Sequence, residues 1–191
     1  MNRTLTGIDP LSDNRYGWDV NSDKFGTCAF TGGAYHVNAI PQPGNGPQPG
    51  KGCTLSKANF VDGAYQVQMR IVKGNGGGIV FRGNEMGNGY YFFIGQNGMY
   101  EFGIYNNCIG TYNNCKISPL RSGSSPAISK GLNQPNLAAV VASGSTIDLY
   151  VNDQKIDSVS DSSYSQGGIG VFASGVNGPT EVAFNDAKVW T

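Results

Sequence analysis

The sequence is poor in charged side chains and contains a single histidine. Charged residues make up 14% of its 191 residues, and 13 basic residues balance 13 acidic ones. The basic residues form no cluster, which argues against nucleic-acid or anionic-membrane binding. No apolar run approaches the roughly 18 residues that a membrane span requires, and the opening MNRTLTGIDP has no apolar signal region. We expect no nucleic-acid partner and no membrane insertion, and an exported form would have lost its leader.

Signatures of nucleophilic and nucleotide chemistry are also missing. His36 is the only imidazole, it lies in the strand-like AYHVNAI, and no nucleophile-elbow motif accompanies it. A structural role for His36 is therefore favoured over that of a catalytic base. The glycine-rich GNGGG and GKG are not followed by a helix start, so neither fits a phosphate-binding loop. We expect no required cofactor.

Four cysteines, Cys28, Cys53, Cys108 and Cys115, allow three disulfide pairings. Sequential pairing is the simplest, closing loops of about 26 and about 8 residues and contributing roughly 3.5 and 2.5 kcal/mol through chain entropy. Structural zinc sites usually space cysteines by two to four residues, whereas six residues separate Cys108 from Cys115. We favour disulfides over free thiols or a metal site. Disulfides in turn favour an extracellular or cell-surface location.

Alternating patterns and turn residues indicate strands. In AYQVQMRIVKG, Val67, Met69 and Ile71 share one face, and Gln66, Gln68 and Arg70 share the other. The following IVFRG, YYFFI and MYEFGIY are separated by GNGGG, NEMGNG and GQNG. The Asn-Gly steps at 88–89 and 97–98 suit hairpin turns. We predict a four-stranded antiparallel meander over residues 64–105.

The remaining segments extend the same pattern. CAFTGGAYHVNAI predicts a hairpin, NLAAVVASGSTIDLYVNDQKIDSVSD three strands, and GGIGVFASG and TEVAFNDAKVWT one strand each. The Pro/Gly tract at 41–52 predicts an unpaired loop, and SPLRSGSSPAISKGLNQP has no clear period. About ten to twelve short strands without a helix predict an all-β, two-sheet antiparallel sandwich, with residues 1–191 forming a single domain.

The order of motifs resembles a known superfamily. GGGIVFRG, GYYFFIGQNGMYEFGIY, the three-strand segment above, GGIGVFA and VAFNDAKVW are similar to the concanavalin A-like lectin/glucanase jelly roll. Laminin-G-like modules and 3-keto-disaccharide hydrolase-type domains belong to that class. The chain looks most like the extracellular domains appended to bacterial receptor-type kinases and secreted proteins, and the likeness is best over residues 58–191. The resemblance implies a convex and a concave sheet, with sugars bound in the concave groove or at loops on one rim.

Catalytic carboxylates of that superfamily are not evident. Retaining glucanases of this fold place carboxylates two residues apart on one strand, so that they flank the glycosidic bond about 5–5.5 Å apart. Glu85, Glu101 and Glu181 have no partner at such spacing. A pair from distant strands, such as Glu101 with Asp62, remains open. We therefore predict no catalytic residues, and keep a glycoside hydrolase or lyase-type enzyme as an alternative.

Sugar binding requires flat apolar faces and a few planar polar groups. Tyr90, Tyr91, Phe92 and Phe93 are consecutive, so one pair must face outward, and we assign Tyr91 to the outer face with Glu101 and Tyr105. Plain cross-strand packing of these aromatics is the competing interpretation, and Arg82 and Glu101 could simply pair across the sheet. The predicted ligand-binding residues are Arg70, Arg82, Tyr91, Glu101, Tyr105, Tyr112 and Asn113.

The repeat YNNCIGTYNNC, residues 105–115, contributes three of these residues. A bridge between Cys108 and Cys115 would make residues 106–114 a rigid finger that presents Tyr105 and Tyr112 beside asparagines. Alternatively, the asparagines only favour turns and the bridge only closes a loop.

Two further expectations concern the ends of the chain. Asp9, Asp13 and Asp186 could meet where the termini approach and hold a structural calcium ion. Terminal strands often pair in this fold, which would place Trp190 in the core and Trp18 in the core or at the rim. Our interpretation is a non-catalytic, extracellular, lectin-like carbohydrate-binding or ligand-sensing module. The alternatives are the enzyme named above and a protein-binding or self-associating adhesion module.

Overall fold

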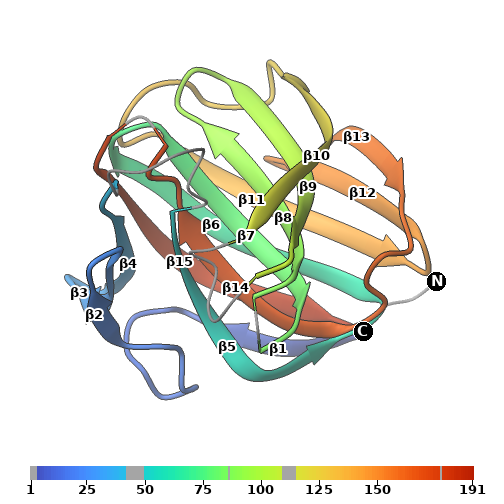
Figure 1. Cartoon of the computed structure of the whole chain (residues 1–191), viewed down its shortest axis with the longest axis horizontal. Coiled ribbons are helices and arrows are strands. Elements are labelled where there is room, and N and C mark those ends of the chain that lie inside the picture. Colours follow the sequence, from blue (N-terminus) through green and yellow to red (C-terminus); the bar gives the residue numbers. More distant parts are fainter. Residues whose placement is uncertain (1–3, 42–49, 86, 109–114, 177) are drawn as a thin grey trace.

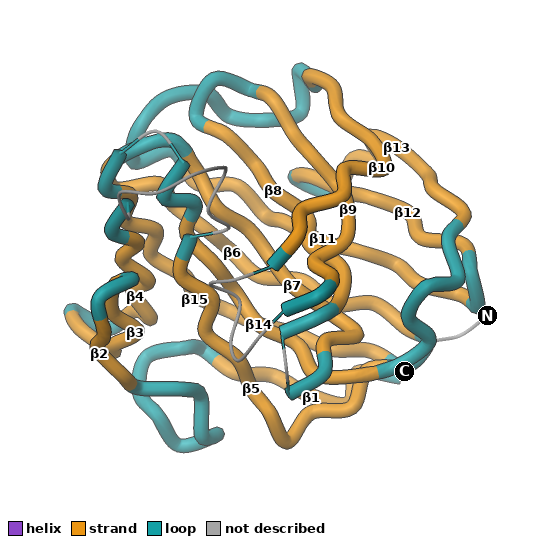
Figure 2. Tube along the Cα trace, viewed as in Figure 1, coloured by secondary structure: helices purple, strands orange, loops and turns teal. Residues whose placement is uncertain are grey.

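The computed structural model describes residues 4–41, 50–85, 87–108, 115–176 and 178–191. All regular secondary structure in this part of the chain is β strand, as Figure 2 shows. The strands form two antiparallel sheets that lie one over the other (Figure 1). The all-β, disulfide-containing sandwich predicted from the sequence is thereby confirmed.

The larger sheet has nine strands, eight of them in the order β13-β12-β11-β6-β15-β4-β3-β2, with β1 pairing the far end of β15. Its strands are β1 (Leu5–Asp9), β2 (Asn21–Asp23), β3 (Gly26–Thr31), β4 (Ala34–Ala39), β6 (Gly63–Lys73), β11 (Pro135–Ser143), β12 (Thr146–Val151), β13 (Gln154–Ser160) and β15 (Thr180–Trp190). The predicted hairpin over CAFTGGAYHVNAI is β3–β4, and the predicted three-strand segment is β11–β12–β13.

The smaller sheet has six strands in the order β10-β9-β8-β7-β14-β5. They are β5 (Lys51–Phe60), β7 (Gly76–Gly83), β8 (Gly89–Gly95), β9 (Met99–Asn106), β10 (Lys116–Ser124) and β14 (Gly167–Ala173). Because β7, β8, β9 and β10 are consecutive in sequence and adjacent in the sheet, their alternate side chains form one continuous outer surface.

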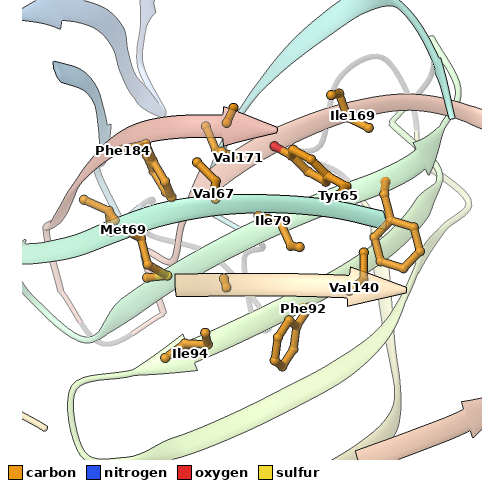
Figure 3. Close-up of a cluster of buried hydrophobic side chains, with 14 of the residues drawn as sticks. Tyr65, Val67, Met69, Ile79, Phe92, Ile94, Val140, Ile169, Val171 and Phe184 are labelled. Atoms are coloured by element: carbon orange, nitrogen blue, oxygen red, sulfur yellow. The ribbon is translucent and has the colours of Figure 1, made fainter. Parts of the chain in front are cut away.

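The core lies between the inner faces of the two sheets. Figure 3 shows Tyr65, Val67 and Met69 of β6 facing Ile79 of β7 and Phe92 of β8. Val67, Met69 and Ile71, which the alternation places on one face, are all buried, and the same alternation in the other strands matches the burial of Ile79, Phe81, Leu149, Val151, Ile169 and Val171. A period of two is therefore sufficient to identify the buried face of these strands.

Several local predictions are wrong. The predicted four-stranded meander is split, because β6 belongs to the larger sheet and only β7, β8 and β9 are neighbours. The irregular polar segment contains β10, and Lys51 and Gly52, at the end of the Pro/Gly tract, already pair in β5. In the turn between β8 and β9, Gly98 has a positive φ of 86°, as a hairpin turn with Asn-Gly requires. In the turn between β7 and β8, the glycine with a positive φ is Gly87 (90°) rather than Gly89, which is the first residue of β8.

Both disulfides predicted by sequential pairing are present. Cys28 of β3 binds Cys53 of β5, and Cys108 binds Cys115. The first bridge ties the larger sheet to the edge strand of the smaller one and lies in the main core, whereas Cys108 and Cys115 pack in a separate cluster described below.

The two ends of the described chain lie together (Figure 1). Strand β1 pairs antiparallel with β15, so the expected pairing of terminal strands is confirmed. Trp18 is buried in the core, whereas Trp190 is only partly buried, which corrects the prediction of a core Trp190. Trp18 Nε1 donates a hydrogen bond of 2.8 Å to the Asp9 carboxylate, so its polar atom is satisfied on burial.

A buried tyrosine makes the stability of the fold sensitive to alkaline pH. The Tyr90 hydroxyl donates to Asp161 Oδ1 at 2.6 Å, and burial followed by this hydrogen bond raises the pKa of Tyr90 to about 12. A raised pKa in the folded state stabilises the fold below the ordinary value near pH 10, and this contribution is lost as the pH rises toward 12. The free energy of unfolding should therefore fall over this interval.

The Tyr90→Phe variant tests this assignment. It should lose less stability than the wild type between about pH 9 and about pH 11.5, by on the order of 1 kcal/mol. Urea unfolding at the two pH values measures the difference, and identical losses would show that Tyr90 does not contribute. Some alkaline loss should remain in the variant because burial also raises the pKa of Tyr35.

Candidate functional site

A second hydrophobic cluster lies outside the main core, on the outer face of the smaller sheet. Its buried members are Val80 of β7, Tyr91 of β8, Tyr105 of β9, Phe172 of β14 and Cys108. Phe93, Cys115 and Ile117 pack against it and are partly exposed. Such a cluster on an outer sheet surface needs explanation, because an outer face that meets only water usually carries polar side chains.

The aromatic rings of the cluster are closely packed. Tyr91 and Tyr105 stack with ring centroids 4.5 Å apart and planes 21° apart. The Phe172 ring meets both edge-on, at 6.4 Å from Tyr91 and 6.2 Å from Tyr105. Phe93 extends the surface along β8, with its ring centroid 6.5 Å from that of Phe172. We call these four side chains the aromatic platform.

Glycines give the aromatic rings their space. Gly103 lies opposite Tyr91 in the β8–β9 pairing, and a Cβ at Gly103 would be 2.6 Å from the Tyr91 hydroxyl oxygen. A Cβ at Gly76 would be 2.8 Å from the ring of Phe93. The rings therefore lie flat over neighbouring strands instead of standing upright, and flat rings leave a hollow above the sheet.

The hollow is a groove of 740 Å³, within the range of small-molecule sites. Tyr91, Phe93, Tyr105 and Phe172 form part of its lining, and Met99, Ile117, Pro119 and Val176 add apolar surface. Polar groups converge on it from two turns, from β10 and from the residue that follows β14: Asn75, Gln96, Asn97, Ser122 and Ser174. This combination of flat apolar surface and a few polar groups is typical of ligand-binding sites.

Glu101 is the one charged side chain among the described residues that line the groove. It lies opposite Phe93 in the β8–β9 pairing, and its Oε1 accepts a hydrogen bond of 2.7 Å from the Tyr91 hydroxyl. Burial, and then the hydrogen bond and charge of Glu101, raise the pKa of Tyr91. Tyr91 therefore remains a neutral donor, and it holds the carboxylate at the platform.

The amide side chains at the end of the groove are positioned by the turns that carry them. Gln96 Nε2 donates to the Gly74 carbonyl at 2.8 Å, and the Gln96 backbone N–H donates to the Asn75 carbonyl at 2.9 Å. The two turns that bring Asn75 and Gln96 to the rim are therefore tied together. Asn97 Oδ1 caps its own turn by accepting from the Met99 N–H at 3.1 Å.

The Cys108–Cys115 bridge adjoins the opposite part of the platform. Cys108 is buried in the cluster that contains Tyr91 and Tyr105, and Cys115 packs against it. The Cys108 N–H donates to Asn88 Oδ1 at 3.0 Å, which fastens the end of β9 to the start of β8. Predicted ligand residues Tyr112 and Asn113 lie outside the described residues.

Three of the predicted ligand-binding residues, Tyr91, Glu101 and Tyr105, line the groove together. Tyr90 faces the core, where it stacks with Phe81 at 5.3 Å, so the assignment of Tyr91 to the outer face matches the structure.

Arg82 is not a groove residue. It is only 1% exposed, and its guanidinium donates to the carbonyls of Val61, Gly144 and Tyr164 and to Asp62 Oδ1. The alternation that predicts an outward arginine is interrupted here, since Arg82 has a left-handed φ of 50° and the β7–β14 pairing shifts register nearby. Arg82 therefore does not line the groove, and it pairs with Asp62 rather than with Glu101.

Arg70 lies on the other sheet. It is an exposed residue of β6, and its neighbours in the pairing are Pro135 and Ala183 of the larger sheet. The alternation assigned it correctly to an outer face, but the two outer faces point in opposite directions. Arg70 is therefore absent from the lining of the groove.

The structure does not assemble the calcium site expected from Asp9, Asp13 and Asp186. Asp9 accepts from the Leu11 N–H and from Trp18, while Asp13 forms a surface ion pair with Arg15. In the described ranges, no group of three or more acidic, histidine or cysteine side chains is placed to share a metal ion. The carboxylates of Asp9 and Asp13 serve instead as local hydrogen-bond acceptors.

The residues considered for catalysis have other partners. His36, for which the sequence favours a structural role, has its Nδ1 2.7 Å from Glu181 Oε1, on the neighbouring strands β4 and β15 of the larger sheet. Asp62 binds Arg82 and the Gly144 N–H, whereas Glu101 binds Tyr91, so the pair Glu101–Asp62 does not form.

Several lining residues were not predicted: Asn75, Phe93, Gln96, Ser122, Phe172 and Ser174. Phe93 was recognisable, because it shares the parity of Tyr91 on β8. Phe172 and Ser174 were not, since they lie about seventy residues away in sequence and reach the groove only because β14 pairs with β7.

The two packed antiparallel sheets form a jelly-roll sandwich, which is the fold that the resemblance of the motifs implied. The carbohydrate-binding module CBM66 from Bacillus subtilis is similar, with a TM-score of 0.68 and 22% identity over 89% of this chain and 93% of that one. A Bacillus subtilis protein of unknown function with a galectin-like fold gives a TM-score of 0.69 at 11% identity, over 97% and 94% of the two chains.

A laminarinase from a Flavobacterium species has a TM-score of 0.62 and 11% identity, with 98% of this chain and 100% of that chain covered. At such identities the likeness establishes the fold. No protein-family model matches the chain, and no curated protein matches it. In the part of the chain that is described, no helix has the length and apolarity needed to cross a membrane.

Proposed function

We propose that the protein is a carbohydrate-binding module that holds a glycan in the groove over the smaller sheet. The observation that carries the proposal is the aromatic platform beside Glu101, exposed along Phe93 and bordered by amide groups. A pyranose ring has an apolar C–H face and a rim of hydroxyls, which match flat rings and planar polar groups respectively. The similarity to a carbohydrate-binding module supports this at the level of the fold.

The residues divide this work between them. Phe93, the partly exposed ring of the platform, offers the apolar surface on which a sugar would stack, and the buried ring of Phe172 packs beside it. Glu101, held by Tyr91, would accept hydrogen bonds from a pair of hydroxyls, and Asn75, Gln96 and Asn97 would both donate and accept at the rim. Because the rings and the carboxylate are already packed or hydrogen-bonded, little conformational entropy is lost when the ligand binds.

Binding is favoured over hydrolysis by the number of carboxylates. Glycoside hydrolysis ordinarily requires two carboxyl groups flanking the bond, and Glu101 is the one carboxylate that the described lining contains. We further propose an extracellular or cell-surface location, because the two disulfides are stable in oxidising compartments.

Substitution of Phe93 tests the proposal. After a glycan-array screen of the oxidised protein has identified a ligand, Phe93→Ala should weaken its binding about tenfold, which corresponds to the stacking contribution of one aromatic ring. Isothermal titration calorimetry measures the affinity, and thermal unfolding checks that the variant is folded.

Tyr150→Ala is the matched control, since Tyr150 is a partly buried aromatic residue on the outer face of the other sheet. It should leave the affinity unchanged. An array without any binding, or equal affinities of wild type and Phe93→Ala, would contradict the proposal. The favoured function would then be that of a protein-binding or self-associating module. Size-exclusion chromatography at several concentrations would detect self-association.

A further inference from the structure

We propose that the ligand of the groove is an uncharged oligosaccharide and that Glu101 excludes glycans that carry carboxylate or sulfate groups. This inference rests on the proposed carbohydrate-binding function and specifies its ligand class. Three observations carry it: the charges that line the groove, the surroundings of Glu101, and the polar groups at the rim.

The described lining of the groove contains no cation to receive an acidic sugar. Its described lining consists of aromatic, aliphatic, amide and hydroxyl side chains, with Glu101 as the single charge. Lys130 packs against Gly98 in a neighbouring turn but does not line the groove. Among the residues that the structure does not describe, 42–49, 86, 109–114 and 177 contain no lysine, arginine or histidine in the sequence, and residues 1–3 contain one cation, Arg3.

The surroundings of Glu101 penalise added negative charge. Tyr91, which binds this carboxylate, is 2% exposed, and burial and the charge of Glu101 both raise its pKa. Both causes disfavour an anion at the Tyr91 hydroxyl, and the charge of Glu101 would also repel a glycan carboxylate or sulfate bound beside it. Such a group would lose hydration on entering the groove and would face the Glu101 charge with no cation in the described lining to offset the repulsion.

The rim favours hydroxyls over an ammonium group. Asn75, Gln96, Asn97 and Ser174 present neutral donors and acceptors in one part of the groove, while only one carboxylate is available to pair with a cation. Neutral sugar hydroxyls can use all of these groups at once. An oligosaccharide of amino sugars could form one ion pair in the described lining, with Glu101, while its other ammonium groups would lose hydration without a carboxylate partner there.

A matched set of glycans tests the inference. A panel of neutral glucan, galactan, mannan and fructan hexasaccharides identifies a neutral ligand of the wild-type protein, and the uronate form of the same oligosaccharide, oxidised at its primary hydroxyls, is the charged probe. Calorimetry at low ionic strength should show that the uronate form binds at least about tenfold more weakly. In Glu101→Gln the ratio of neutral to uronate affinity should fall by about five- to tenfold.

Glu181→Gln removes the same charge from the outer face of the other sheet and should keep the wild-type ratio. Uronate binding as tight as neutral binding would overturn the inference, as would tighter binding of a chitosan hexamer than of the acetylated chitin hexamer. Equal changes in the two variants would also overturn it, since net charge alone would then explain the ratio. Failure of every neutral glycan would refute the proposed function itself, which separates that failure from the others.

Discussion

Replacing Gly78 with alanine is expected to lower the free energy of unfolding by at least about 3 kcal/mol, a large share of the stability of an ordinary domain. Gly78 lies in β7 between β8 and β14, and a Cβ at this position would be 1.9 Å from the Phe92 carbonyl oxygen. Backbone atoms cannot move aside as a flexible side chain can. The two glycines before it are equally confined, since a Cβ at Gly76 or Gly77 would meet a carbonyl oxygen at 2.3 Å or 2.1 Å.

Urea unfolding measures the effect, and Gly168→Ala is the matched control. Gly168 lies in β14 of the same sheet, but the nearest atom to its added Cβ would be 3.6 Å away, which is ordinary van der Waals contact. The control should change stability by less than about 1 kcal/mol. If both variants were equally stable, the close approach of strands β7 and β8 would not constrain this position.

Replacing Arg82 with methionine is expected to destabilise the protein by about 3–5 kcal/mol. The guanidinium is buried and donates to Val61 O at 2.9 Å, Gly144 O at 3.0 Å and Tyr164 O at 3.1 Å, so its removal leaves three carbonyls without a donor. These acceptors come from three separate loops, which a single side chain ties together. Denaturant unfolding measures the loss.

Arg70→Met is the control, because Arg70 is exposed on the outer face of the larger sheet. It should change stability by less than about 0.5 kcal/mol. Glycan affinity per folded molecule should be unchanged in the Arg82 variant, since the guanidinium does not line the groove. Weaker glycan binding with unchanged stability would restore the ligand role that alternation in the sequence predicted for Arg82.

The positions of Arg70 and Arg82 in the structure show where predictions from local sequence patterns fail. The alternation in β6 correctly places Gln66, Gln68 and Arg70 on an outer face, but a period of two cannot say which sheet a strand joins. At Arg82 the alternation itself ends, because a left-handed residue and a register shift turn the side chain into the loops. The chain at this turn is close to Gly167, where a Cβ would meet the Gly83 carbonyl oxygen at 2.3 Å.

The two disulfides also show the difference between what local sequence patterns predict and what the tertiary structure decides. Spacing predicted both bridges, yet it could not show that Cys28–Cys53 lies in the main core while Cys108–Cys115 packs beside Tyr91 and Tyr105. The second bridge is part of the support of the platform.

Local chemistry was sufficient for most of the strands and turns, for the disulfide pairing and for the buried faces. It also identified Tyr91, Glu101 and Tyr105 as neighbours on one face, because all of these depend on residues close in sequence. The division of strands between the sheets, the addition of Phe172 and Ser174 to the groove, and the burial of Arg82 were decided by the tertiary fold. The physical reason is that each depends on pairing between segments far apart in sequence, as with β14 and β7. Backbone hydrogen bonds are the same for every residue type, so the residues of one strand do not specify which strand will pair with it.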